Sequence, residues 1–108
     1  MVSTAELAKA IGMAVRTGKV LFGSKSAVKA AKLGKAKLII VAENCPGDVR
    51  KDIEYYAHLS GVPVVEFKGS SYDLGLVCGK PFMVSALTIR DPGLSRIMEL
   101  VEGESGGA

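Results

Sequence analysis

Apolar positions near the N-terminus follow the spacing of a helix. They recur three or four residues apart, on one helix face, and comprise Leu7, Ile11, Ala14 and Val15. Just before them, Ser3 and Glu6 have the S-x-x-E arrangement of a capping box, in which each side chain caps the other residue's backbone N–H. We therefore predict a helix over residues 4–16, ended by Thr17 and Gly18.

A short strand and a second helix are predicted next. The apolar run after Lys19 predicts a strand over residues 19–22, ended by Gly23. Either Ser24 or Ser26 is suited to cap the following helix, and Gly34 is its predicted stop. The apolar positions of this helix are Ala27, Val28, Ala31 and Leu33. Its three lysines, at positions 25, 29 and 32, are three or four residues apart and therefore share a face.

The middle of the chain predicts a buried strand and a third helix. The run Leu38-Ile39-Ile40-Val41-Ala42 contains no polar residue, which predicts a central strand covered on both faces. A loop from Asn44 to Asp48 then opens a helix that ends near Ser60, with Gly61 beyond it. The predicted buried stripe of this helix comprises Val49, Ile53, Tyr56, Ala57 and Ser60.

The remaining elements are shorter. Residues 64–67 predict a strand, and Ser70-x-x-Asp73 caps a short helix that runs to about Val77. The last strand falls within residues 82–90 and a final helix over residues 95–101. Because strands and helices alternate, we predict an α/β fold, a three-layer α/β/α sandwich around about four strands. The 108 residues suit one domain, 1–108, with residues 103–108 as a disordered tail.

Charge is distributed unevenly along the chain. Between Leu7 and Ala42 there are eight basic residues and no acidic one, whereas the rest of the chain carries six basic and eleven acidic residues. A one-sided excess of this kind indicates a polyanionic partner such as nucleic acid. A solvated lysine-rich face is the alternative that charge alone leaves open. No apolar run approaches the roughly 20 residues of a membrane span, so we expect a cytoplasmic protein.

Residues that commonly carry catalysis or bind metals are sparse. Cys45 and Cys78 are far apart and His58 is the only histidine, so the chain lacks zinc-ligand spacing and we expect no metal or cofactor. Residues 23–26, Gly-Ser-Lys-Ser, are similar to the end of a phosphate loop but lack the upstream glycine of G-x-x-x-x-G-K-[ST]. A small α/β nucleotide-binding enzyme, using Gly23 and a Glu43–Asp48 carboxylate pair, is therefore the weaker alternative.

An RNA ligand explains the same loops better. Gly23 permits close approach of a backbone, and the N–H groups that begin the next helix suit a phosphate. Lys25 opposes the helix dipole in that first turn, so a ligand explains it better than the helix does. Phe82 follows a Gly-Lys-Pro loop and, if exposed, would stack on an unpaired base. The alternative is that Phe82 begins the last strand and packs in the core.

Four stretches of the chain resemble the archaeal and eukaryotic large-subunit ribosomal protein 30e family, part of the kink-turn RNA-binding superfamily that includes the 7Ae proteins. They are T-G-K-V-x-x-G-S-K-S-x-V-K-x-A at 17–31, A-K-L-I-I-V-A-x-N at 36–44, D-I-E-Y-Y-A-x-L-S-G-V-P-V at 52–64 and L-G-x-x-x-G-K-P-F at 74–82. The 7Ae proteins usually have G-T-N-E at the position of residues 23–26, so the resemblance is to 30e in particular.

The resemblance implies a four-stranded mixed sheet with an RNA-binding end made of three loops. The residues that it implies in RNA binding are Gly23, Ser24, Lys25, Lys29, Asn44, Arg50, Gly79, Lys80, Pro81 and Phe82. The first three would contact the kinked strand and its sheared G·A pairs. Asn44 and Arg50 would contact base and backbone, and Phe82 would stack near an extruded nucleotide.

The function implied is non-catalytic. The resemblance implies a component of the large subunit of the cytoplasmic ribosome that binds a kink-turn element of ribosomal RNA beside neighbouring ribosomal proteins. A kink-turn binder of RNA modification or processing complexes is the alternative, since the physics of binding would be shared. The modest size and the absence of a coiled-coil pattern lead us to expect a monomer when the protein is free.

Overall fold

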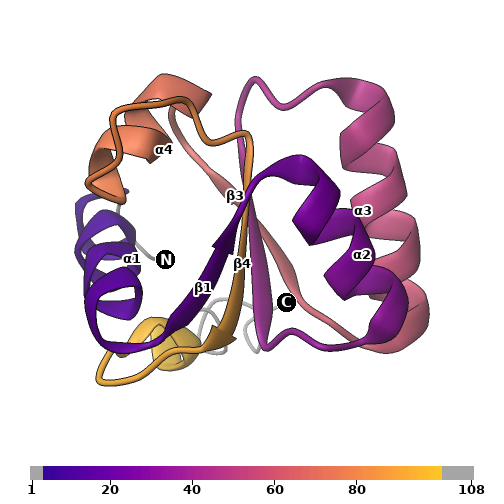
Figure 1. Ribbon diagram of the computed structural model, residues 1–108, viewed down its shortest axis with the longest axis horizontal. Coiled ribbons are helices and arrows are strands. Elements are labelled where there is room, and N and C mark those ends of the chain that lie inside the picture. The colour runs from indigo at the N-terminus through magenta and orange to yellow at the C-terminus, as the bar shows by residue number, and fades with distance from the viewer. Residues whose placement is uncertain (1–3, 101–108) are drawn as a thin grey trace.

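The computed structural model describes residues 4–100 and contains a mixed four-stranded sheet between two layers of helices (Figure 1). The helices are α1 (Thr4–Thr17), α2 (Ser24–Leu33), α3 (Gly47–Ser60) and α4 (Ser71–Val77), and the strands are β1 (Lys19–Phe22), β2 (Leu38–Ala42), β3 (Val64–Phe67) and β4 (Ala86–Asp91). Residues 97–100 are also helical. The predicted α/β class and four strands are confirmed. The predicted Ser3 cap and the tail at 103–108 lie outside the described residues.

The strands do not follow chain order in the sheet. Their order is β1-β4-β2-β3, with β2 and β3 parallel and β4 antiparallel to both of its neighbours. The C-terminal ends of β1, β2 and β3 therefore meet the N-terminal end of β4 at one edge of the sheet. That edge is the upper one in Figure 1.

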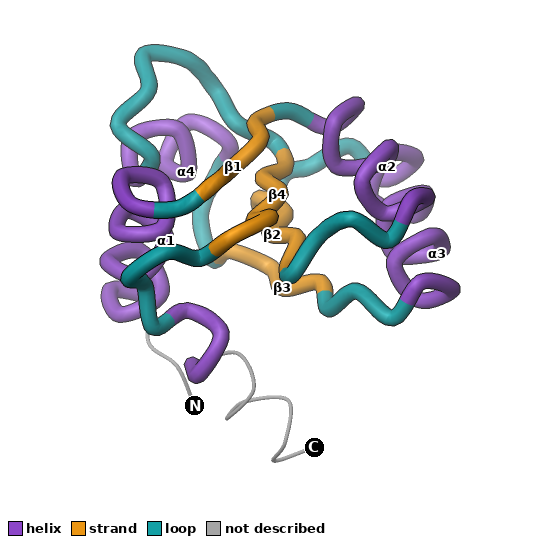
Figure 2. The backbone as a smooth tube through the Cα atoms, turned by 60° about the horizontal axis from the view of Figure 1, so that its bottom comes forward, coloured by secondary structure: helices purple, strands orange, loops and turns teal. Residues whose placement is uncertain are grey.

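Strand β2 is the buried centre that its apolar sequence predicted. All five of its residues are buried, and they alternate between two cores. Leu38, Ile40 and Ala42 belong to the core that α1 and α4 cover, whereas Ile39 and Val41 belong to the core under α2 and α3. Figure 2 shows the two helix layers on opposite sides of the strands.

Most predicted helix ends are confirmed. Gly34 and Gly61 end α2 and α3 in the left-handed conformation, with φ of 66° and 73°, a conformation that favours glycine. The capping box at α4 is complete. The Asp73 N–H donates to Ser70 Oγ at 3.2 Å, and the Ser70 N–H donates to Asp73 Oδ2 at 3.1 Å.

Some local predictions are wrong. The N-cap of α2 is Gly23, and neither Ser24 nor Ser26 caps it, because the positive φ of Gly23 (106°) turns the chain so early that Ser24 is already helical. Leu33 was assigned to the apolar face of α2 but is 56% exposed. Ser60, predicted within the buried stripe of α3, is exposed, although its hydroxyl donates to the Ala31 carbonyl at 2.8 Å.

Candidate nucleic-acid interface

Four loops meet at the sheet edge where β1, β2 and β3 end and β4 begins. Backbone hydrogen bonds join them. Gly23 N–H donates to the Ala86 carbonyl, Ala42 N–H to the Ser85 carbonyl, and Glu43 N–H to the Gly69 carbonyl, each at 2.9 Å. We call the surface formed by residues 22–25, 43–46, 69–71 and 79–85 the loop edge. Segments far apart in the sequence thus lie side by side in one surface.

The β1–α2 loop presents an open helix N-terminus. No side chain caps α2, and its first turn contains no acidic residue. A Cβ added to Gly23 would meet nothing within 4 Å, so its positive φ, rather than crowding, requires the glycine. The first N–H groups of α2 have no acceptor within the helix, and exposed Lys25 lies in the same turn. The local charge therefore favours an anion.

Asn44 connects the β2–α3 loop to α4. Its Oδ1 accepts a hydrogen bond from the backbone N–H of Ser71 at 2.7 Å, and the Ser71 carbonyl in turn accepts from the Val84 N–H at 3.0 Å. Because the oxygen of the Asn44 amide is occupied, its NH₂ group is the part that a ligand would meet. Ser71 itself is buried. The first bond orients Asn44, and the two bonds together connect the β2–α3 loop, the start of α4 and the loop before β4.

The loop before β4 presents an aromatic ring to solvent. Phe82 is 53% exposed, which decides between the two alternatives that the sequence left open. Its ring makes an edge-to-face contact with Phe22, at 6.5 Å between centroids and 89° between planes. Lys80 Nζ lies 5.0 Å from the centroid of the Phe22 ring. The β1–α2 loop and the residue 79–82 loop therefore support each other through Phe22, whose contribution sequence reasoning missed.

A hollow of about 420 Å³ lies around Phe82. It is lined by Tyr72, Leu76, Lys80, Pro81, Phe82 and Met83. Four of these are large exposed apolar side chains, of which Met83 is the most exposed at 68%. An apolar hollow with one cation is suited to the face of a nucleobase and its phosphate.

Gly75 of α4 fixes the position of this loop. A Cβ at Gly75 would lie 2.1 Å from the Phe82 carbonyl oxygen, so only glycine permits the backbone of residues 82–83 to lie against α4. Lys80 N–H also donates to the Gly75 carbonyl at 3.0 Å. The sequence signal was a glycine inside a predicted helix, which often marks a close approach of backbones.

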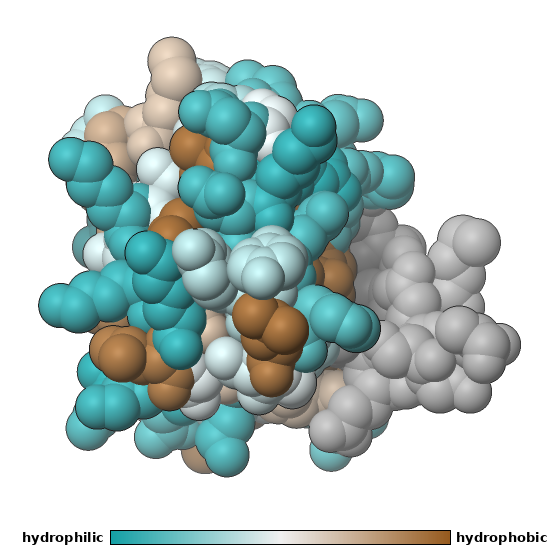
Figure 3. All heavy atoms as spheres, turned by 90° about the vertical axis from the view of Figure 1, so that its right-hand side faces the viewer, coloured by the Kyte–Doolittle hydropathy of each residue, from teal (hydrophilic) through white to brown (hydrophobic). Residues whose placement is uncertain are grey.

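The lysines of α2 extend the positive surface beyond the loop edge. Lys25, Lys29 and Lys32 are exposed and line a hollow of about 310 Å³ between α2 and α3. Lys32 Nζ lies 4.9 Å from the Tyr56 ring centroid. Figure 3 faces this side of the molecule and shows mostly polar side chains with separate hydrophobic patches. In residues 4–100, the basic side chains that form ion pairs are Arg50, Lys68 and Arg96, and none of these α2 lysines is among them.

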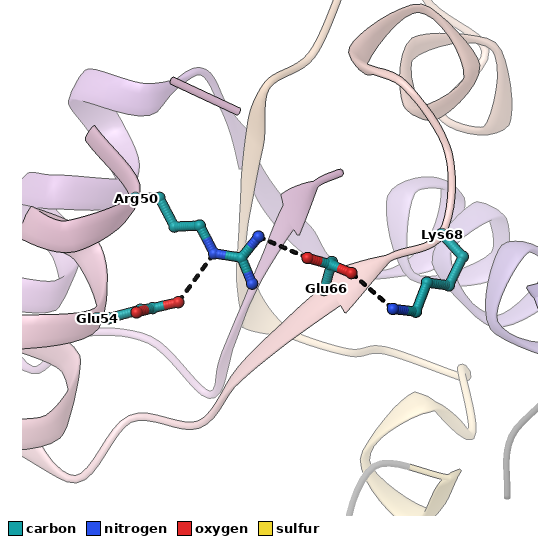
Figure 4. A network of polar contacts seen from close by, with 4 residues as sticks. All are labelled: Arg50, Glu54, Glu66 and Lys68. Carbon is teal, nitrogen blue, oxygen red and sulfur yellow. Dashed lines mark hydrogen bonds and ion pairs between the residues drawn. The ribbon is translucent and has the colours of Figure 1, made fainter. Parts of the chain in front are cut away.

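Arg50 occupies a different environment from the other predicted site residues. Its guanidinium donates to Glu54 at 2.9 Å and to Glu66 at 2.5 Å, and Glu66 also accepts from Lys68 at 2.7 Å (Figure 4). The hydrogen bond to Glu54, followed by that to Glu66, raises the pKa of Arg50. Hydrogen bonds from Lys68 and then Arg50 lower the pKa of Glu66. The structure gathers the other nine predicted residues at the loop edge and along α2, but it engages Arg50 in this ion-pair cluster.

Neither cysteine is an activated thiol. Both cysteines are buried and free, and burial raises the pKa of Cys45 and raises that of Cys78 to about 11. Within residues 4–100, no group of three His, Cys, Asp or Glu side chains could hold a metal ion. Of the helices in the same range, none is both long enough and apolar enough to cross a membrane.

Known proteins share this architecture. The backbone superposes on a solved structure titled as a protein with unknown function from Bacillus halodurans with a TM-score of 0.74. The match covers 92% of this chain and 97% of the other at 23% identity, and it assigns the fold alone. The fold and the surface described above together define the class of this protein, an α/β sandwich with a basic, aromatic loop edge.

Sequence comparison identifies the family. The model of the ribosomal protein L7Ae/L30e/S12e/Gadd45 family matches residues 5–99. A protein of Methanocaldococcus jannaschii named "Large ribosomal subunit protein eL30" is 54% identical over 99 residues, which cover 92% of this chain and 90% of that protein. A protein of the same name from Methanothermobacter thermautotrophicus is 52% identical, over 89% of this chain and 98% of that protein. The chain belongs to the ribosomal protein L7Ae/L30e/S12e/Gadd45 family, as its sequence motifs predicted, and these relatives are named as ribosomal components rather than enzymes.

Proposed function

We propose that this protein is a non-catalytic component of the large ribosomal subunit that binds a kink-turn element of ribosomal RNA through its loop edge. The observation that carries the proposal is the juxtaposition of Lys25, the Asn44 amide and the exposed Phe82 ring on loops hydrogen-bonded to one another. The names of the archaeal relatives support the ribosome as its location. They favour it over the RNA-processing alternative. Neighbouring ribosomal proteins would be its other partners.

Each part of the loop edge has a separate role in this proposal. The open N-terminus of α2 and Lys25 receive a phosphate or the acceptor edge of a guanine in a sheared G·A pair. The Asn44 NH₂ group donates to a base or to the backbone. The ring of Phe82 stacks on a nucleotide that the bend in the RNA extrudes, a contact worth about 1–3 kcal/mol per base.

A bent RNA suits this surface better than a straight one. In an A-form helix the major groove is too deep and narrow for side chains to read and the bases are paired and stacked, whereas a bend exposes unstacked bases. The loop edge offers one aromatic hollow and one anion-binding helix end in fixed positions. Because the loops are held together by backbone hydrogen bonds, the surface selects an RNA of matching shape without being reorganised.

Binding to two short RNAs at one fixed salt concentration tests the proposal. One RNA contains a kink-turn with tandem sheared G·A pairs, and the other carries Watson–Crick pairs at the same positions. We expect a preference of about a hundredfold, roughly 2.7 kcal/mol, for the kinked RNA. Equal affinity would mean that the lysines attract any polyanion, and the proposed site would have to be abandoned.

A further inference from the structure

A second basic surface lies on the flank of α2 beside β1 and β4. It is a shallow groove of about 250 Å³ whose lining includes Leu21 of β1, Leu33 of α2, Arg90 of β4 and Lys35, which follows α2. Lys29 lines both this groove and the hollow between α2 and α3. The groove thus continues the positive surface of α2 onto a side of the molecule away from the Phe82 hollow.

The positive charge of the groove is not compensated locally. Three of its lining residues are cations, Lys29, Lys35 and Arg90, and no carboxylate lines it. All three are exposed. Among residues 4–100, none of the three forms an ion pair. Like charges that line one groove repel one another, and an anionic occupant would relieve that repulsion.

The floor of the groove distinguishes it from the loop edge. Leu21 and Leu33 are 38% and 56% exposed, and no aromatic residue lines the groove. Bases splayed out of an RNA are usually bound by stacking on aromatic rings, so the groove is poorly suited to an unstacked base. Aliphatic side chains flanked by cations match the alternating riboses and phosphates of a nucleic-acid backbone.

We propose that this groove binds the sugar–phosphate backbone of a second RNA segment, separate from the one at the loop edge. Lys35 and Arg90 contact its phosphates, and Leu21 and Leu33 pack against its riboses. The inference rests on the proposed function only in taking RNA as the polyanion. The groove is lined from Ser26, in the first turn of α2, to Lys35, just beyond its end, so the second RNA segment would lie along this ten-residue helix, which is about 15 Å long.

The test uses the full chain and two differently labelled RNAs. The protein is first saturated with the kinked RNA, and an unkinked RNA duplex of about 16 base pairs is then titrated at low salt. The test variant is Lys35→Glu/Arg90→Glu. The matched control is Lys9→Glu/Arg16→Glu, which changes net charge equally at two exposed positions of α1, across the sheet from α2. Thermal unfolding of each variant verifies that it is folded.

We expect the duplex to bind the saturated wild type and the control, and to bind the test variant about tenfold or more weakly, with kinked-RNA affinity little changed. With the neutral substitution Lys35→Ala/Arg90→Ala, the affinity for the duplex should depend less steeply on salt. The slope of log K against log salt concentration should decrease in magnitude by about 2. Equal losses in the test and control variants would overturn the proposal, since they would reflect net charge. A second outcome would also overturn it. If an acidic leucine-rich peptide shifts the NMR signals of Leu21 and Leu33 and displaces the duplex, the groove binds a protein partner rather than RNA. If the kinked RNA does not bind at all, the loop-edge proposal fails, and titrating the free protein with the duplex still tests the groove.

Discussion

The loop edge and the Arg50 cluster carry the same types of charge but present them differently. At the loop edge, Lys25 lies beside an uncapped helix end with no acidic residue in the turn. In the cluster, Arg50 and Lys68 share Glu66, and Glu54 completes the neutralisation of Arg50. A cation is available to a polyanion only where its neighbours leave it uncompensated. A count of basic residues along the sequence does not make this distinction.

Removal of Lys25 should have the largest effect on RNA binding. A hydrogen bond involving a charged group contributes about 1.5–3 kcal/mol, so Lys25→Ala should weaken binding of the kinked RNA about tenfold to a hundredfold. Isothermal titration at fixed salt measures this. Lys9→Ala, on α1, is the control and should change little. Equal losses in both variants would indicate diffuse electrostatic attraction.

The aromatic part of the loop edge should contribute somewhat less. Phe82→Ala removes a stacking surface worth about 1–3 kcal/mol per base and should weaken kinked-RNA binding accordingly. Because the ring is half-exposed, the thermal midpoint should change little. Tyr55→Ala, a similarly exposed aromatic substitution on α3, should leave affinity unchanged. A Phe82 variant with full affinity would remove stacking from the proposal.

Gly75→Ala tests whether the position of the residue 79–85 loop matters for RNA binding, because it shifts the loop without removing any of its side chains. The added Cβ would lie 2.1 Å from the Phe82 carbonyl, so the backbone at residues 82–83 must move, and overpacking of this kind costs about 1–3 kcal/mol. Chemical denaturation should show that loss, and kinked-RNA affinity should fall although no RNA contact is removed. Unchanged stability would mean that the loop relaxes freely.

Arg50→Ala tests whether a cation that is already engaged in ion pairs contributes to RNA binding. Since its guanidinium is already bound to Glu54 and Glu66, kinked-RNA affinity should change by less than about threefold, and stability by about 0–1 kcal/mol, as for exposed ion pairs. The family resemblance implies the opposite, an RNA contact. A loss as large as that of Lys25→Ala would show that Arg50 leaves its carboxylates when RNA binds.

The smallest expected effect is on acid stability. Hydrogen bonds from Lys68 and Arg50 lower the pKa of Glu66 below its usual value of 4.5. Below that value the unfolded chain binds more protons at this site than the folded protein, so the stabilisation is complete above about pH 4.5 and is lost as pH falls. Glu66→Gln should reduce the dependence of unfolding free energy on pH in this acidic range. An unaltered profile would assign the acid sensitivity to other carboxylates.

Local sequence signals predicted most of the architecture. Three predicted features depend on neighbours within a few residues and are confirmed: the apolar run of β2, the stops at Gly34 and Gly61, and the cap at Ser70. The charge excess is concentrated on α2, which carries three of its lysines, but the RNA-binding role that it indicates stays a prediction.

The features that were missed depend on tertiary contacts. Glu66 is sixteen residues from Arg50, and only the packing of α3 beside β3 reveals that they pair. The exposure of Phe82 depends on Gly75 and on the ring of Phe22, neither of which a periodicity can place beside it. Leu33 fitted the helical spacing of α2 but lies in the last turn, where it is left exposed.

The order of the strands determines when the loop edge can form during synthesis. Strand β4 is the last strand within residues 4–100, yet it lies between β1 and β2, and it is the strand with which β1 pairs in this sheet. Until residues 86–91 have left the exit tunnel of the translating ribosome, β1 cannot pair, and the Gly23–Ala86 and Ala42–Ser85 bonds cannot form. Because these contacts are distant in sequence, their formation is also a slow kind of folding step. A nascent or truncated chain would therefore carry the lysines of α2 without the assembled surface, and it should attract RNA without discriminating its shape.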